Sequence, residues 1–165
     1  MAPSITPTHG VKLNPLFTGS SSGERYHAPV PIEWDVRYHP TRSAEIANMP
    51  LLSSHLSQFA TNPPIPKLHL CRTVLEAIYE TLRQLVRGHE WEGMSLKQRG
   101  RIEDIHRARC RASLYPEHAR LAGVRRADCL LSTTMFAGLT SLVRRREQWQ
   151  VVLTLSRDFR PRVHY

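Results

Sequence analysis

A stripe of apolar side chains at helical spacing is the feature of this sequence that most constrains its fold. Within residues 74–87, apolar side chains recur every three or four positions and so share one face of a helix. They are Val74, Leu75, Ile78, Leu82, Leu85 and Val86. Thr73 and Glu76 have the spacing of a capping box, and Gly88 can adopt the left-handed conformation that ends a helix. The pattern predicts a helix over 74–87 that must bury this face against another element.

A second capping box, at Ser95 and Gln98, predicts a helix over 95–114, before Pro116. Its apolar side is thin and consists of Leu96, Ile102, Ile105, Ala108 and Ala112. The rest of its surface carries six basic side chains: Lys97, Arg99, Arg101, Arg107, Arg109 and Arg111. Only two carboxylates oppose them, so this helix is the predicted source of a basic face.

Alternation of apolar and polar residues predicts the strands. It is strict from Ile32 to Tyr38, where every second side chain is apolar or aromatic, and Pro31 and Pro40 bound the run. Further short strands are predicted over residues 67–71, 127–132 and 149–156, with a hairpin turn at 144–147. Residues 135–139 are expected to form an apolar return or a short strand.

The order of these elements is strand, strand, helix, helix and then strands, which differs from the regular alternation of a doubly wound sheet. It predicts an α+β fold in which a small, mainly antiparallel sheet packs against two amphipathic helices. With 165 residues, the chain has the size of one domain. We expect a globular domain over residues 31–157, a flexible segment over 1–30 in which Leu13–Phe17 docks on the domain, and a basic tail over 158–165.

Positive charge is concentrated in the second part of the chain. Residues 1–66 carry no net charge, whereas residues 67–165 hold the whole net charge of +9. An Arg-rich surface favours an anionic partner, since Arg can bind a carboxylate or a phosphate through two parallel hydrogen bonds. The predicted partner- or anion-binding residues are Lys97, Arg99, Arg101, Arg107, Arg109, Arg111, Arg125 and Arg126.

Two kinds of macromolecule fit this charge. Residues 95–126 hold nine basic and three acidic side chains but only one aromatic residue, Tyr115. Proteins that bind single-stranded nucleic acids usually place stacking rings among the charges. No helix-turn-helix, zinc-finger, RRM or KH signature occurs in the sequence. An acidic protein partner is therefore the first expectation, and a nucleic acid is the alternative.

Candidate reactive groups do not assemble into a recognisable site. His106 and Cys110 are four residues apart, which suits two metal ligands on one helix face, but a structural zinc needs about four. His69 and Cys71 share a predicted strand face, as any two residues at this spacing do. No GxSxG elbow, P-loop or GxGxxG fingerprint occurs. We predict no catalytic residue, metal or cofactor, and keep a small enzyme of unknown reaction as a second alternative.

Two further sets of residues are interpreted structurally. The large aromatic residues on predicted strands are expected in the core rather than in a ligand pocket: Trp34, Phe136 and Trp149. Three charged residues on predicted strands are Asp35, Arg37 and Asp128. An acid beside an anion clamp is one interpretation of them, but we favour an ion pair across neighbouring strands.

Short landmarks along the chain form an ordered pattern. They are Leu13-Asn14-Pro15-Leu16, Trp34-Asp35-Val36-Arg37 with Pro40, Ala60-Thr61-Asn62-Pro63-Pro64, Thr73 to Ile78, Arg126-Ala127-Asp128-Cys129-Leu130-Leu131, and Phe136-Ala137-Gly138-Leu139 before Trp149. Over residues 13–156 the chain thus resembles an uncharacterised domain family of basidiomycete fungi. That pattern more often has a β-branched residue at Ala127 and an aromatic or aliphatic one at Cys129. The resemblance implies one domain of fungal origin and brings no activity, substrate or catalytic residue.

The cysteines and the chain start indicate an intracellular protein of the cytoplasm or nucleus. Cys71, Cys110 and Cys129 are odd in number and far apart, which suits reduced thiols rather than a disulfide framework. The first residues lack the layout of a signal peptide, and no stretch approaches the roughly 18–20 apolar residues of a membrane span. Together with the basic face predicted for the helix over 95–114, this favours a non-catalytic interaction or regulatory module that binds an acidic partner.

Overall fold

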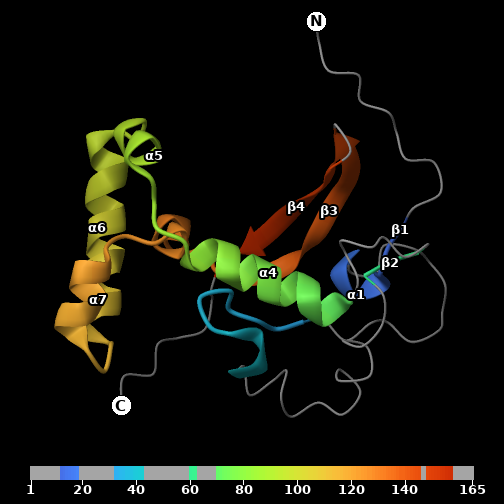
Figure 1. Ribbon diagram of the computed structural model, residues 1–165, viewed down its shortest axis with the longest axis horizontal. Helices are drawn as coiled ribbons and strands as arrows, with labels where there is room; N and C mark the ends of the chain where they lie inside the picture. The colour runs from blue at the N-terminus through green and yellow to red at the C-terminus, as the bar shows by residue number, and fades with distance from the viewer. Residues whose placement is uncertain (1–11, 19–31, 43–59, 63–69, 146–147, 158–165) are drawn as a thin grey trace, which may run out of the picture.

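One long helix and a β-hairpin form the centre of the fold (Figure 1). The computed structural model describes residues 12–18, 32–42, 60–62, 70–145 and 148–157. Helix α4 (Cys71–Arg83) lies beside strands β3 (Met135–Arg145) and β4 (Gln148–Ser156), which pair antiparallel. The register of the hairpin shifts between Phe136 and Gly138 and again between Thr140 and Val143. The predicted α+β class is confirmed.

Apolar burial holds α4 against the hairpin. Val74 and Leu75 are buried together with Leu139 of β3, and Ile78 and Leu82 are partly buried against the same cluster. Full burial of a leucine side chain such as that of Leu75 stabilises a fold by about 1.5–3 kcal/mol. The predicted apolar stripe therefore faces the sheet from Val74 to Leu82.

The predicted limits of this helix are wrong at both ends. It begins at Cys71 after Leu70, which forms no side-chain cap, so the expected capping box at Thr73 and Glu76 lies inside the helix. It ends at Arg83, because the following residues bond to a distant segment: Gln84 accepts a 2.9 Å hydrogen bond from the Arg126 amide, and Leu85 forms a β-bridge with Arg125. Leu85 is 53% exposed rather than buried.

The segment 32–38 has the predicted buried face but is not a strand. Ile32, Trp34 and Val36 are buried, whereas Tyr38 is 61% exposed. Only Asp35 forms a β-bridge, with Met135 at the start of β3. The chain then turns, because the Tyr38 amide donates to the Asp35 carbonyl at 3.0 Å and the indole Nε1 of Trp34 donates to the Tyr38 carbonyl at 2.8 Å. A short 3-10 helix, η1 (Pro40–Arg42), follows.

The segment around Leu13–Phe17 contributes to the core. Strand β1 (Lys12–Leu13) pairs with β2 (Thr61–Asn62), and the short helix α1 (Pro15–Thr18) follows β1. Leu16 and Phe17 are buried, and the Phe17 ring meets the Phe136 ring edge-on at 6.4 Å. Gly138 has φ +132° and a Cβ there would lie 2.5 Å from the Phe17 carbonyl oxygen, so this contact requires glycine. The rest of the expected flexible segment and tail lies outside the described residues, and the domain limits stay predictions.

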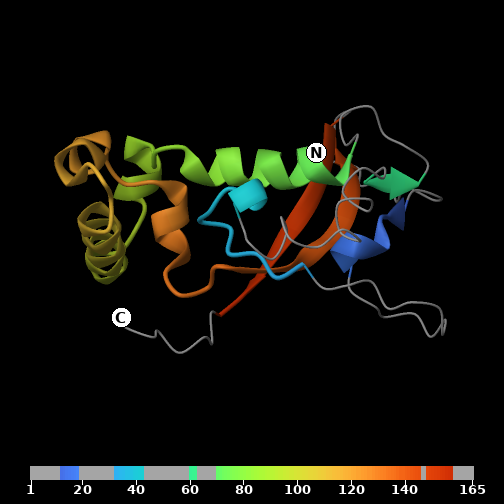
Figure 2. The ribbon, with the colours of Figure 1, turned by 90° about the horizontal axis from the view of Figure 1, so that it is seen from below.

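Four helical elements form a cluster at one end of α4, which we call the helical end, residues 88–130. It comprises α5 (Gly88–Glu92), α6 (Leu96–Arg111), α7 (Pro116–Ala122) and the 3-10 helix η2 (Arg126–Leu130). Figures 1 and 2 both show α6 and α7 beyond the end of α4, away from β1 and β2. Helix α6 contacts α7 and η2, and η2 contacts α4 as well as α6.

Predictions at the helical end are partly right. The cap of α6 is confirmed: the Ser95 amide donates to Oε1 of Gln98 at 2.9 Å, and Ser95 Oγ accepts from the Gln98 amide at 3.3 Å. The helix ends at Arg111 rather than 114. Of its predicted apolar side, only Ile102 is buried and Ile105 half-buried, whereas Leu96, Ala108 and Ala112 are exposed. Gly88 opens α5 instead of closing a helix, and α7 was not predicted.

The remaining strand predictions are also only partly right. Residues 135–139 and 149–156 lie in β3 and β4 as predicted, and Arg145 pairs with Gln148 at the hairpin turn, whose residues 146–147 lie outside the described chain. The strand predicted over 127–132 is wrong, because η2 occupies this region and Leu131 has φ +55°. For the strand predicted over 67–71, residues 67–69 lie outside the described chain and Cys71 belongs to α4.

In the part of the chain that the structure describes, no helix has both the length and the apolar character needed to cross a bilayer.

Candidate functional site

The outer face of α6 carries a line of exposed cations. Lys97, Arg101 and Arg111 are exposed and, with Asp104 and Ala108, follow one another at intervals of three or four residues. Residues at this spacing share one helix face. Within the described chain, no carboxylate pairs with any of these three cations. Arg107 also lies at the surface but pairs with Asp104 at 2.6 Å.

The opposite face of α6 places Arg109 against η2. Its Nε donates to Oδ1 of Asp128 at 2.8 Å and its Nη2 to Oδ2 at 2.9 Å, so the guanidinium binds the carboxylate with two parallel bonds. The same Nη2 donates to the Gly123 carbonyl at 3.0 Å. The side chain of Asp128 is only 2% exposed, and its hydrogen bond raises the pKa of Arg109. Arg109 therefore joins α6 to η2 and is not available to a partner.

His106 and Cys110 belong to the same inward face. The Nδ1 atom of His106 lies 2.9 Å from Nη2 of Arg109 and 3.7 Å from Oδ2 of Asp128. The Cys110 thiol is buried and lies 3.7 Å from both ring nitrogens of His106. Arg109 donates to both oxygens of Asp128, so this carboxylate serves the contact between α6 and η2. Among the described residues, no three His, Cys, Asp or Glu side chains gather as metal ligands.

Arg99 and Arg126 are also used within the fold. Arg99 donates to the carbonyls of Glu92 at 2.8 Å and Met94 at 3.0 Å, and its Cζ lies 5.9 Å from the centre of the Trp91 ring. Arg126 donates from Nη2 to Oε1 of Glu90 at 2.8 Å. These contacts tie the α5–α6 turn and η2 together rather than presenting free charges.

Arg125 occupies an intermediate position. It is half-buried, and its backbone amide donates to Oδ2 of Asp128 at 2.8 Å. Burial lowers the pKa of Arg125, and the nearby cations Arg109 and Arg83 lower it further. Arg109 and Arg125 thus both lie near the carboxylate of Asp128, and Arg109 is the one that pairs with it.

The basic residues predicted as one binding set therefore separate into groups. Lys97, Arg101 and Arg111 face outward, Arg107 faces outward with a paired charge, Arg125 is half-buried, and Arg99, Arg109 and Arg126 serve the fold. A signal for this division existed in the sequence. Arg99, Ile102, His106 and Arg109 follow at intervals of three or four, so they share the face that Ile102 buries.

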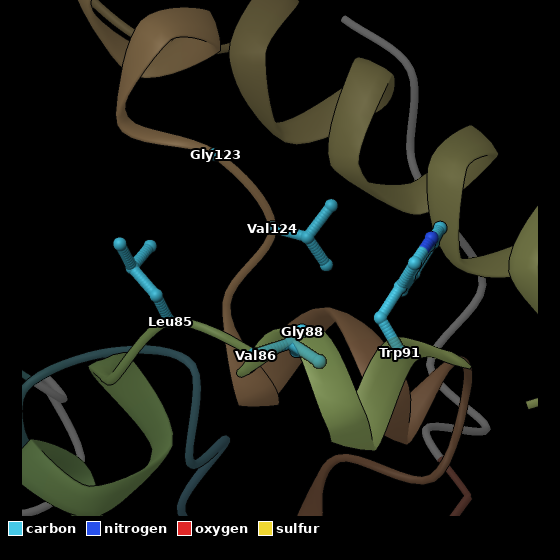
Figure 3. A pocket seen from close by; sticks show the side chains of 6 residues that line it. All are labelled: Leu85, Val86, Gly88, Trp91, Gly123 and Val124. Atoms are coloured by element: carbon cyan, nitrogen blue, oxygen red, sulfur yellow. The ribbon is translucent and has the colours of Figure 1, made fainter. Parts of the chain in front are cut away.

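An apolar pocket at the start of α5 was not predicted. It has a volume of about 320 Å³ and is lined by Leu85, Val86, Gly88, Trp91, Gly123 and Val124. Figure 3 shows the side chains of Val124 and Trp91 approaching the space from two separate segments, with Gly88 between them at the start of α5. Gly123 has φ +87° where the chain leaves α7, which favours glycine. The pocket depends on residues far apart in sequence, which is why no local pattern revealed it.

The landmark residues have mainly structural environments. Trp34 and Phe136 are buried, with ring centres 5.9 Å apart, so their expected place in the core is confirmed. The backbone of Trp149 pairs with Arg144 across the hairpin, and its side chain lies outside the described part.

Within the described chain, the ion pair expected between neighbouring strands is not formed: Asp35 and Asp128 each pair with another partner. Asp35 binds Arg37 two residues away, with Nε of Arg37 at 2.9 Å from Oδ1 of Asp35. The Arg37 amide also donates to Oδ1, so this pair stabilises the turn after Trp34. Asp128 instead pairs with Arg109 on α6.

Comparison with known proteins gives one match. The family described as "Family of unknown function (DUF6699)" matches residues 32–149, from the turn segment through the helical end to the start of β4. No curated protein matches the chain, and no solved structure does. Because the match covers well over half of its length, the chain belongs to this family of unknown function.

Proposed function

We propose that this domain is a non-catalytic, intracellular interaction module that binds an acidic segment of a partner protein on the outer face of α6. The observation that carries the proposal is the line of Lys97, Arg101 and Arg111, which are exposed and have no carboxylate partner in the described chain. Within the described chain Cys71, Cys110 and Cys129 form no disulfide, which is consistent with a reducing compartment.

The spacing of these cations favours an extended ligand. From Lys97 to Arg111 the helix rises by about 20 Å, at about 1.5 Å per residue. A single small anion cannot span this length, whereas an acidic helix or extended segment can place several carboxylates along it. Long-range attraction of this kind accelerates encounter and weakens with salt, because exposed charges are screened.

Nucleic acid is the alternative anionic partner, and the aromatic residues argue against it. Binding of single strands draws much of its affinity from rings that stack on bases, at about 1–3 kcal/mol per base. Within the described residues of α6 and the turn to α7, Tyr115 is the one exposed aromatic side chain. Charge alone would give weak, strongly salt-dependent binding.

The test replaces the line of charges and keeps the total change of charge constant. One variant carries Lys97→Glu, Arg101→Glu and Arg111→Glu, and its matched control carries Arg72→Glu, Arg120→Glu and Arg157→Glu at exposed sites outside α6. Binding of the full-length variants to polyglutamate, to single-stranded RNA and to duplex DNA is measured by fluorescence anisotropy at low and high salt. Circular dichroism checks that each variant is folded.

We expect polyglutamate to bind the native chain and the control, and to bind the α6 variant at least about tenfold more weakly. Equal loss in the two variants would mean that only bulk charge matters and would contradict the proposal. Tighter binding of RNA or DNA than of polyglutamate, lost in the α6 variant, would instead support the nucleic-acid alternative.

A further inference from the structure

We infer that the apolar pocket between α5 and the segment after α7 takes one aliphatic or aromatic side chain of the acidic partner. The partner would then be a segment in which an apolar anchor is flanked by carboxylates. This inference rests on the proposed function and adds a second, specific contact to it. Three observations support it: the apolar lining, the prior bracing of the walls and the basic residues that adjoin the lining.

The lining suits an apolar side chain in size and chemistry. A volume of about 320 Å³ lies at the lower end of the range for ligand pockets, so it fits an anchor side chain better than a large ligand. Leu85, Val86, Trp91 and Val124 supply apolar walls, and the two glycines leave space between them. Transfer of one leucine-sized side chain from water into such a site strengthens binding by about tenfold or more.

The walls are braced by contacts that already exist in the free protein. The Val86 amide donates to the Val124 carbonyl at 3.0 Å, and the Arg126 amide donates to the Gln84 carbonyl at 2.9 Å. The ion pair between Arg126 and Glu90 joins η2 to α5. A pocket whose walls are fixed in this way requires little ordering when it binds, which favours affinity.

Basic residues adjoin the pocket lining. Arg87, which is exposed, lies in sequence between the lining residues Val86 and Gly88, and Arg125 directly follows the lining residue Val124. The guanidinium of Arg99 lies 5.9 Å from the ring centre of Trp91. The nearby carboxylate of Glu90 is engaged by Arg126 and by the Arg87 amide, which lowers the pKa of Glu90. Carboxylates on either side of an apolar anchor would complement these basic residues.

Gly88 offers a way to fill the pocket without disturbing its walls. It lines the pocket, and a Cβ placed there meets no heavy atom within 4 Å. It lacks the positive φ that would make a larger residue strained. Gly88→Leu should therefore occupy the pocket, and Gly88→Ala is the matched control, because it makes the same backbone change with little added volume.

The experiment selects short random peptides on phage against the immobilised full-length chain and measures the enriched peptides by fluorescence anisotropy. We expect sequences with one Leu, Ile, Phe or Trp among Asp and Glu residues. Their affinity should fall about tenfold in Gly88→Leu, as it should when the anchor of the peptide is replaced by Ser, and should stay within about twofold in Gly88→Ala.

Each other result overturns the inference in a recognisable way. Enrichment of acidic peptides without an anchor, or with an anchor whose affinity Gly88→Leu does not change, overturns the pocket assignment and leaves the proposed function in place. Enrichment of apolar peptides that lack acidic residues overturns the charge argument. Failure to enrich acidic peptides at all contradicts both the inference and the proposed function.

Discussion

The two ends of the molecule are held together by different forces. At the hairpin end, eleven buried residues of the described chain form one cluster, which includes Phe17, Trp34, Leu75 and Leu139. At the helical end the buried apolar residues are Ile102, Cys110 and Ala119, while Asp128 is buried with its charge paired. The first region is therefore stabilised by apolar packing, and the second depends on hydrogen bonds, caps and ion pairs.

This difference bears on where a partner is expected to bind. The helical end exposes most of its charged side chains, because its apolar core is small. A region held by polar contacts also opens more readily, since few buried apolar contacts resist local unfolding. The following changes test the comparison, from the largest expected effect to the smallest.

Trp34→Ala should have the largest effect, because it removes the largest fully buried side chain of the hairpin end. Truncation of a buried aromatic residue to alanine costs about 3–5 kcal/mol of unfolding free energy. Urea denaturation followed by circular dichroism measures this loss. Tyr38→Ala is the control within the same segment: the side chain is mostly exposed, and its removal should cost less than about 1 kcal/mol. Similar losses in the two variants would contradict the assigned core.

Asp128→Asn should have the largest effect at the helical end. It removes the charge that pairs with Arg109 and keeps nearly the same shape, so a partly buried cation loses its counterion. Breaking a buried pair costs about 3–5 kcal/mol, and we expect about 3 kcal/mol because the Arg109 side chain remains partly exposed. The exposed pair of Asp104 and Arg107 provides the control, since Asp104→Asn should cost less than about 1 kcal/mol.

Hydrogen exchange would show where this loss falls. If the two ends are stabilised separately, the Asp128→Asn variant should exchange faster at the amides of α6 and η2 than the native chain does, with little change in β3 and β4. Uniform acceleration across both regions would mean that they unfold as one unit, and the comparison between them would have to be abandoned.

Sequence reasoning succeeded where the determining contacts are local. The box of Ser95 and Gln98 spans three residues, and the alternation of β4 follows from its own side chains, so both were predictable. It failed where contacts with residues distant in sequence determine the local conformation. Asp35 turns the chain after a single bridge to Met135, so the alternation of residues 32–38 marked burial without a strand.

The same cause explains the errors in the candidate site. Asp128 caps η2 through the Arg125 amide and binds Arg109, which lies 19 residues earlier, so local spacing showed neither that residues 127–132 form no strand nor which carboxylate Arg109 binds. The basic helix itself was predicted correctly. Which of its charges face outward depended on the partners that the fold supplies.

A pH dependence should distinguish the two ends through their thiols. Burial raises the pKa of the Cys71 thiol from 9.0 to about 11. The unfolded chain begins to lose this proton near pH 9 while the folded chain holds it, so the stabilising contribution is present below pH 9 and is lost as the pH rises to about 11. The expected loss is about 2–3 kcal/mol.

Cys71→Ala should flatten the dependence of unfolding free energy on pH over this window, as measured by urea denaturation at a series of pH values. Burial also raises the pKa of Cys129 at the helical end, but that side chain is only half-buried. Cys129→Ala should therefore flatten the curve less than Cys71→Ala does. The opposite order would show that the helical end excludes water better than the hairpin end.

Ser95→Ala should have the smallest effect among these changes and tests the local part of the comparison. It removes the hydroxyl that accepts from the Gln98 amide, and loss of such a cap costs about 1 kcal/mol. Thr73→Ala is the matched control: Thr73 has the same sequence signature but lies inside α4, where its hydroxyl caps nothing, so we expect less than about 0.5 kcal/mol. Thermal unfolding followed by circular dichroism compares the stability of the two variants. If Thr73→Ala proves the more costly, α4 begins later than the structure places it, and the cap at Thr73 that the sequence predicted would be restored.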